Sequence, residues 1–114
     1  MRTITEYRFG HICVDDEAHD KDVVIYPDRV YGPWWRKEGH RLDADDLEAV
    51  FAARPRVLIV GTGYYGNMKV PEETRRSIES HGIELHVART PEAVDLFNTM
   101  REAADVVAAL HLTC

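Results

Sequence analysis

The sequence predicts a single α/β domain in which a mixed central sheet is flanked by helices, with an additional N-terminal β-hairpin. Three observations support this prediction. Residues 57–60 (Val-Leu-Ile-Val) are apolar at every position, which is typical of a strand buried on both faces of a sheet. Helical patterns precede and follow this run, as in α/β domains. Two short stretches with strand character lie before residue 27.

The composition sets the class of protein. The chain has 114 residues, 45% hydrophobic and 30% charged, which fits one globular domain over residues 1–114. The formal net charge is -6 and the basic residues are scattered, so we expect no nucleic-acid binding. No apolar run is long enough to cross a bilayer, and the first residues lack a secretory signal. We therefore expect a cytoplasmic protein without membrane insertion, with Cys13 and Cys114 as reduced thiols.

The N-terminal third predicts two strands and a loop. Residues 7–14 show strand alternation with a bulge at Gly10, and residues 21–26 form a β-branched and aromatic run. We expect these two strands to pair as a hairpin. Residues 30–40 then form a loop or a short strand that contains both tryptophans.

Capping residues mark the helices and the remaining strands. Asp43 is a suitable N-cap, and Pro55 disfavours helical conformation in the residue before it, so the first helix should end near residue 53. Pro71 lies in the first turn of a second helix that Gly82 ends, and Thr90 is the N-cap of a third. Strands are expected over residues 83–88 and 105–112, with an extended helix as the alternative for the second segment.

A glycine-rich turn follows the central strand. Its sequence, Gly61-Thr62-Gly63-Tyr64-Tyr65-Gly66, matches the G-x-G-x-x-G pattern of dinucleotide-binding turns. The context differs from that fingerprint. Pro71 begins the helix too late, and the next strand ends in Arg89 rather than in an acid that would bind a ribose. The pattern therefore does not indicate a dehydrogenase.

Two interpretations of this turn stay open. In the steric one, Gly61 and Gly63 let the chain leave the strand sharply, with positive φ. In the other, backbone N–H groups of the turn bind a phosphate or carboxylate, with Arg89 nearby. The candidate ligand-binding residues are Thr62, Gly63, Tyr64, Lys69, Arg89 and Thr90.

No set of catalytic residues stands out. Serine occurs only at Ser77 and Ser80, on a predicted helix and outside any nucleophile-elbow pattern. His11 and Cys13 would share one face of a strand, but no second close pair completes a metal site. Asn98 is expected to act as a hydrogen-bond partner on the third helix. We therefore predict no catalytic residues, no metal and no cofactor, which makes an enzyme the less favoured class.

The segment Trp34-Trp35-Arg36 is the candidate partner-binding site. In one interpretation, one tryptophan fills the open end of the core and the other covers it. In the other, the segment is a contact surface, because tryptophan and arginine are enriched among the residues that dominate binding energy at protein interfaces. The sequence favours both about equally.

From about Tyr26 onward, the chain resembles the domain-of-unknown-function 498 family. The pieces that support the resemblance are Trp35-Arg36 with Gly39-His40, Leu58-Ile59-Val60-Gly61-Thr62-Gly63, Val70-Pro71, His81-Gly82-Ile83, Thr90 with Ala93, Phe97-Asn98, and His111-Leu112-Thr113-Cys114. Animal members of this family include an adipogenesis-associated protein and a mitochondrial complex I assembly factor.

The resemblance implies a single α/β domain with a mixed sheet and an extra hairpin. It also implies a role in assembly through protein contacts, and it implies no catalytic residues. We therefore predict a non-enzymatic protein-binding or assembly module with a protein partner. The alternative is a small-molecule or anion-binding protein with its site at the glycine-rich turn. A homodimer is compatible with either function.

Overall fold

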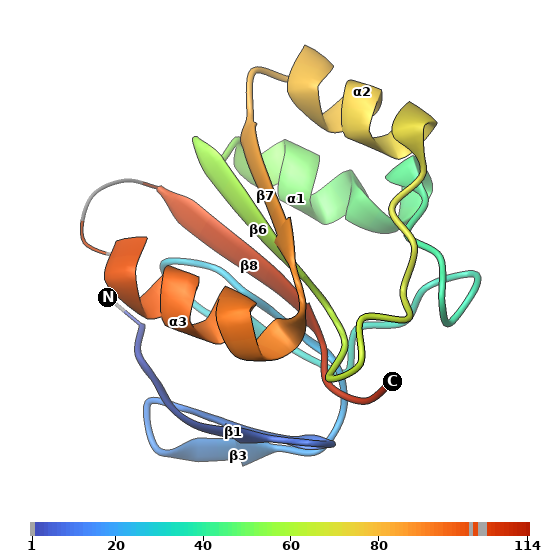
Figure 1. Cartoon of the computed structure of the whole chain (residues 1–114). Coiled ribbons are helices and arrows are strands. Elements are labelled where there is room, and N and C mark those ends of the chain that lie inside the picture. The colour runs from blue at the N-terminus through green and yellow to red at the C-terminus, as the bar shows by residue number, and fades with distance from the viewer. Residues whose placement is uncertain (1, 101, 103–104) are drawn as a thin grey trace.

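The computed structural model describes residues 2–100, 102 and 105–114, and it contains two sheets (Figure 1). The smaller sheet is three-stranded and antiparallel. Its strands are β1 (Ile4–Arg8), β2 (His11–Val14) and β3 (Glu17–His19). The larger sheet has five strands in the order β5-β4-β8-β6-β7. These strands are β4 (Val23–Ile25), β5 (Val30–Tyr31), β6 (Val57–Thr62), β7 (Glu84–Ala88) and β8 (Val106–His111).

The helices cover both faces of the larger sheet. They are the 3-10 helix η1 (Ala44–Leu47), α1 (Glu48–Ala53), α2 (Glu72–Ser80) and α3 (Thr90–Met100). Figure 1 shows α3 and the smaller sheet on one side of the larger sheet, and α1 and α2 on the other. Among the described residues, no helix has both the length and the apolar character that crossing a bilayer requires.

Strand β6 is the centre of the fold. It is buried along its whole length and is parallel to both of its neighbours, β7 and β8. Val57 and Ile59 join the core beneath α3, whereas Leu58 and Val60 join the core beneath α1 and α2. Side chains alternate along a strand, so one apolar run supplies both cores. The fold class predicted from the sequence is confirmed.

The N-terminal pairing differs from the prediction. Gly10 lies in the turn between β1 and β2, with φ 73°, and not within a bulged strand. The residues of β4 do not pair with this hairpin. They pair antiparallel with β8 on one side and with β5 on the other, so β4 lies inside the larger sheet. The reason is burial: β4 is apolar at every position and needs cover on both faces, which a small exposed hairpin cannot provide.

Asn98 on α3 links this helix to strand β1 of the smaller sheet. Its Oδ1 accepts a hydrogen bond from the Ile4 N–H at 3.0 Å, and its Nδ2 donates to the Ile4 carbonyl at 2.8 Å. The expectation from the sequence that Asn98 acts as a hydrogen-bond partner is confirmed. These two bonds join it to the backbone of a strand 94 residues away.

Replacing Asn98 with alanine should lower the free energy of unfolding by about 2 kcal/mol, because it leaves two partly buried backbone groups unpaired. Urea unfolding would measure this loss, and amide exchange at Ile4 should accelerate. Thr99→Ala is the matched control, since the bond that the Thr99 hydroxyl makes within the described part of the chain is an exposed one to the Asp95 carbonyl of its own helix. Equal effects of the two changes would contradict the proposed role of Asn98.

Candidate functional site

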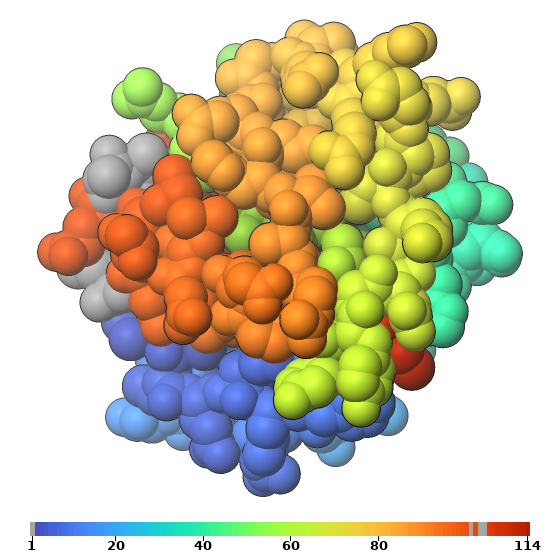
Figure 2. Space-filling view, in the orientation of Figure 1, coloured from blue at the N-terminus to red at the C-terminus, as the bar shows by residue number. Residues whose placement is uncertain are grey.

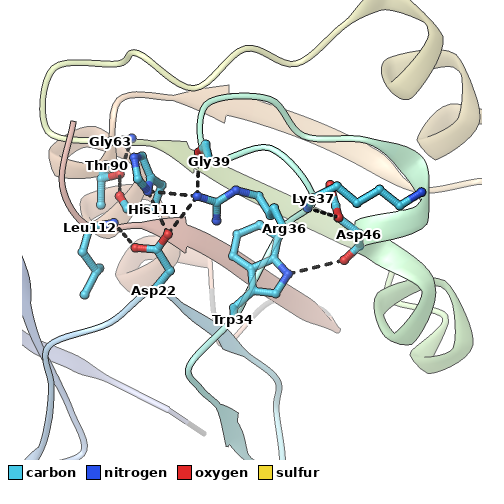
Figure 3. Close-up of polar contacts among 10 residues, drawn as sticks. All are labelled: Asp22, Trp34, Arg36, Lys37, Gly39, Asp46, Gly63, Thr90, His111 and Leu112. Carbon is cyan, nitrogen blue, oxygen red and sulfur yellow. Dashed lines mark hydrogen bonds and ion pairs between the residues drawn. The ribbon is translucent and has the colours of Figure 1, made fainter.

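A buried ionic cluster lies at the carboxyl ends of β6 and β8. Asp22 immediately precedes β4, His111 ends β8, and Arg36 comes from the loop after β5. Because Val23 pairs with Leu110, the antiparallel register places Asp22 directly opposite His111. Figure 3 shows the three side chains converging.

The hydrogen bonds of the cluster are short. Asp22 Oδ2 lies 2.9 Å from Arg36 Nη2 and 2.8 Å from His111 Nδ1. The other carboxylate oxygen accepts the Leu112 N–H at 2.8 Å. Arg36 Nη2 also donates to the Gly39 carbonyl at 2.8 Å. The cluster therefore fastens the loop after β5 to the end of β8.

Only 4% of the Arg36 side chain is exposed, so removing its carboxylate partner would leave a buried charge uncompensated. Burial by itself raises the pKa of Asp22. Hydrogen bonds from His111 and Leu112, together with the charges of His111 and Arg36, outweigh that effect, so the pKa of Asp22 lies below its ordinary value. Asp22 is therefore ionised at neutral pH and holds its partners as a carboxylate.

The cluster does not contain an activated nucleophile. The contact of His111 Nδ1 with the Asp22 carboxylate, at 2.8 Å, is shorter than its 3.2 Å contact with Arg36 Nη2, which favours an Nδ1 proton donated to Asp22. Within the described chain, His111 Nε2 and the Arg36 atoms Nε and Nη1 have no hydrogen-bond partner. A Ser-His-Asp or Cys-His arrangement needs a hydroxyl or thiol at Nε2. The geometry favours a rigid support over a catalytic dyad.

The structure separates the two adjacent tryptophans. Trp34 is 5% exposed and belongs to the core beneath α1 and α2, with its ring 4.7 Å from Arg36 Cζ. Trp35 is 72% exposed. A pocket of about 300 Å³ lies beside Trp35 and is lined by Asp22, Arg36 and His111 among others. A second pocket, of about 320 Å³, lies between Trp35, Tyr31 and the first helical segments.

The predicted glycine-turn residues are brought together in part. The Gly63 N–H donates to Thr90 Oγ1 at 2.8 Å, and that hydroxyl donates to the His111 carbonyl at 2.6 Å. Thr62 Oγ1 donates a hydrogen bond to the Ala88 carbonyl.

Lys69 lies apart from these contacts, because its backbone forms hydrogen bonds with His40 and Leu42. Gly61 lies within β6 without positive φ, and there an added Cβ would lie 2.8 Å from Thr90 Oγ1.

The amides of this turn donate to other parts of the protein. Tyr64 and Asn67 donate to the carbonyls of Thr113 and Cys114, at 2.6 and 2.8 Å. Figure 2 shows these C-terminal residues against the glycine-rich segment. Arg89 donates to the Tyr64 carbonyl from Nε and Nη2. Anion binding at this turn stays a prediction. The N–H groups of Tyr64, Asn67 and Arg89, which an anion would need as donors, bind backbone carbonyls of the protein instead.

An exposed aromatic cluster next to the turn was not predicted. Phe9 approaches the rings of Tyr64 and Tyr65 with centroid distances of 6.0 and 5.9 Å, and the two tyrosine rings are 5.0 Å apart. The sequence places Phe9 more than fifty residues from the tyrosines. Only the docking of the first hairpin beside the turn makes them neighbours.

Asp22 and His111 were also not predicted as site residues. Each borders an apolar strand, Asp22 before β4 and His111 at the end of β8. Pairing those two strands in an antiparallel register would have placed the residues opposite each other. The sequence pattern instead favoured a hairpin between residues 7–14 and residues 21–26, which include the β4 segment. Arg36 is the one member of the cluster that was predicted as a site residue.

Comparisons with known proteins agree with this fold. A conserved hypothetical protein from Pyrococcus horikoshii is 31% identical, with a TM-score of 0.85, over 98% of this chain and 99% of that one. An outer membrane protein from Bartonella henselae is 26% identical, with a TM-score of 0.81, over 97% of this chain and 94% of that one. A Mth938-like domain from Bordetella pertussis, 22% identical with a TM-score of 0.78, shares the fold over 97% of this chain and 85% of that one.

A family model for proteins of unknown function matches residues 4–111, nearly the whole chain. The sequence pieces that supported the resemblance also meet in space. Arg36 bonds to Gly39, and the His40 ring lies edge-on to that of His111, with centroids 5.7 Å apart. The chain belongs to the DUF498/DUF598 family of proteins of unknown function.

Proposed function

We propose that the chain is a non-enzymatic binding module that recognises a protein partner through its tryptophan surface. This surface consists of Trp35, Tyr31 and the pocket of about 320 Å³ that they line. One observation supports the proposal above all: Trp35 is 72% exposed although the side chains of Trp34 and Arg36 on either side of it are buried. Exposed tryptophans beside a pocket are typical anchors of protein interfaces.

The loop that presents Trp35 is held before any partner arrives. The Trp34 N–H donates to the Asp22 carbonyl at 2.8 Å, and Arg36 is fixed in the ionic cluster. The Lys37 N–H donates to Asp46 Oδ1 at 3.1 Å. Less conformational entropy is lost when a rigid loop binds than when a flexible one does. The buried cluster thus supports recognition without contacting the partner itself.

The surroundings of the pocket indicate the chemistry of the partner. Glu48 is exposed at its edge, as is Asp45, which pairs with Lys37 Nζ at 2.8 Å, and the whole chain carries a formal net charge of -6. Arg29, also at this pocket, lies over the Tyr26 ring, 4.1 Å from its centroid. The surface suits an apolar side chain flanked by positive charge, and binding should weaken as salt is added.

Trp35→Ala should reduce recovery of the partner by at least about tenfold, the change expected when an interface anchor is truncated. Tagged wild-type chain and variant would be used to capture proteins from lysate of the native organism, and the bound proteins would be quantified by mass spectrometry. The partner that is lost would then be purified and titrated at two salt concentrations, with tryptophan emission followed. Emission from Trp35 should shift to the blue as the ring leaves water.

Tyr65→Ala is the matched control, because Tyr65 is 64% exposed and lines neither pocket. It should retain the partner. Trp34 is unsuitable for this test, since its ring is part of the core and its removal would disturb the fold. If the partner binds the Trp35→Ala chain as well as the wild type, or if both variants lose it equally, the tryptophan surface is not the binding site.

A further inference from the structure

Three different metal-ligating side chains meet on the outer face of the smaller sheet. His11 and Cys13 lie two residues apart on β2, so both point to the same side. Glu6 on β1 is the register partner of Cys13, next to an irregularity that follows Ile4. Strand pairing therefore supplies the third group, which the sequence pattern alone does not show.

The three ligand atoms converge on one point. Cys13 Sγ lies 3.4 Å from His11 Nε2 and 3.8 Å from Glu6 Oε1, and His11 Nε2 lies 3.7 Å from Glu6 Oε1. Zinc bonds of about 2.0 Å to nitrogen and oxygen and about 2.3 Å to sulfur, at tetrahedral angles, would place such atoms roughly 3.3 to 3.5 Å apart. The observed separations are within a few tenths of an ångström of that geometry.

The same contacts do not fit a catalytic thiol. In a Cys-His-acid arrangement, one ring nitrogen faces the thiol and the acid orients the ring through the other. Here Cys13 and Glu6 both approach Nε2.

We propose that Glu6, His11 and Cys13 form a binding site for Zn²⁺ with three protein ligands and one open position. The mixture of thiolate, imidazole and carboxylate suits a borderline-soft divalent ion. Arg8 Nε lies 3.4 Å from Glu6 Oε2, which leaves Oε1 directed at the other two ligands. This site shares no residue with the tryptophan surface, so each proposal can fail without the other.

Titration of the reduced, metal-free chain with Co²⁺ tests the proposal. Co²⁺ adopts the same coordination and reports it optically. We expect saturation at one equivalent, with a thiolate-to-metal charge-transfer band in the near ultraviolet that Zn²⁺ abolishes by competition. Cys13→Ser should lose this band. Cys114→Ser, which removes the other thiol of the chain, should keep it.

Two further variants keep the test decisive if Cys13→Ser folds poorly. Glu6→Gln and His11→Gln should retain the charge-transfer band but weaken Co²⁺ affinity by at least about tenfold, since even outer-shell partners of metal ligands contribute that much. Circular dichroism would confirm that each variant is folded. The proposal is overturned if the wild type gives no charge-transfer band, if Cys13→Ser keeps it, or if neither glutamine variant weakens binding.

Discussion

Replacing Gly63 with alanine should lower the free energy of unfolding by about 4 kcal/mol. A Cβ at this position would lie 2.5 Å from the Cys114 carbonyl carbon and 2.8 Å from the Thr113 oxygen. These are backbone atoms, so neither a rotamer change nor a flexible side chain can relieve the overlap. Overpacking of this kind costs about 1–3 kcal/mol, and φ of 109° adds about 1–3 kcal/mol for any residue with a side chain.

The measurement is urea unfolding of Gly63→Ala beside Gly82→Ala. Gly82 also has positive φ, 75°, but a Cβ added there would meet no atom of the described residues within 4 Å beyond its chain neighbours. Its substitution should therefore cost only the backbone strain, about 1–2 kcal/mol. Amide exchange at Tyr64 and Asn67 should accelerate in Gly63→Ala alone. An equal loss of unfolding free energy in the two variants would show that residues 113 and 114 do not pack against Gly63.

Asp22→Asn should lower the free energy of unfolding by about 3 kcal/mol at neutral pH, because it leaves the buried Arg36 guanidinium without its counter-ion. The amide could still accept the Leu112 N–H, so the loss comes mainly from the missing charge. Asp28→Asn is the matched control, since Asp28 pairs with Arg29 in an exposed position where ion pairs contribute little. The control should leave the urea midpoint nearly unchanged. A comparable loss in both variants would contradict the role assigned to the buried pair.

The unfolding free energy of the wild type should depend on acidic pH differently from that of Asp22→Asn. The pKa of Asp22 is lower in the folded protein than its ordinary value of 3.8, so the folded state favours the carboxylate. The resulting stabilisation is complete above pH 3.8 and is lost as the pH falls through the folded pKa. Asp22→Asn lacks this loss. The difference in unfolding free energy between the two proteins should therefore shrink below about pH 4, and a constant difference would contradict the shift.

Local sequence patterns were sufficient for most of the large sheet. The uninterrupted apolar run from Val57, Pro71 before a helix and Gly82 after it each act through neighbouring residues. The helix after Asp43 was also predicted, although it begins as 3-10 turns, with Asp46 Oδ2 accepting the Asp43 N–H. These elements need no information about distant segments.

The pairing of the strands and the residues of the buried ionic cluster could not be predicted from local sequence patterns. The apolar residues of β4 would suit either a hairpin or the central sheet, and only burial on both faces decides between them. Asp22 and His111 become neighbours through that pairing, 89 residues apart. Trp34 and Trp35 are equivalent in sequence, yet the fold buries one and exposes the other. Of the three residues in the predicted partner-binding segment, Trp35 is the one that the proposed tryptophan surface includes.

The position of residues 111–114 affects how the protein reaches its folded state. They accept or donate bonds with Tyr7, Gly10, Asp22, Tyr64 and Asn67, and the Tyr7 contact spans 105 residues. Closing such long loops costs chain entropy before any contact compensates, and non-local contacts form slowly. The loop that presents Trp35 is held to this region through the contact of Arg36 with His111. This loop should therefore become ordered late in folding.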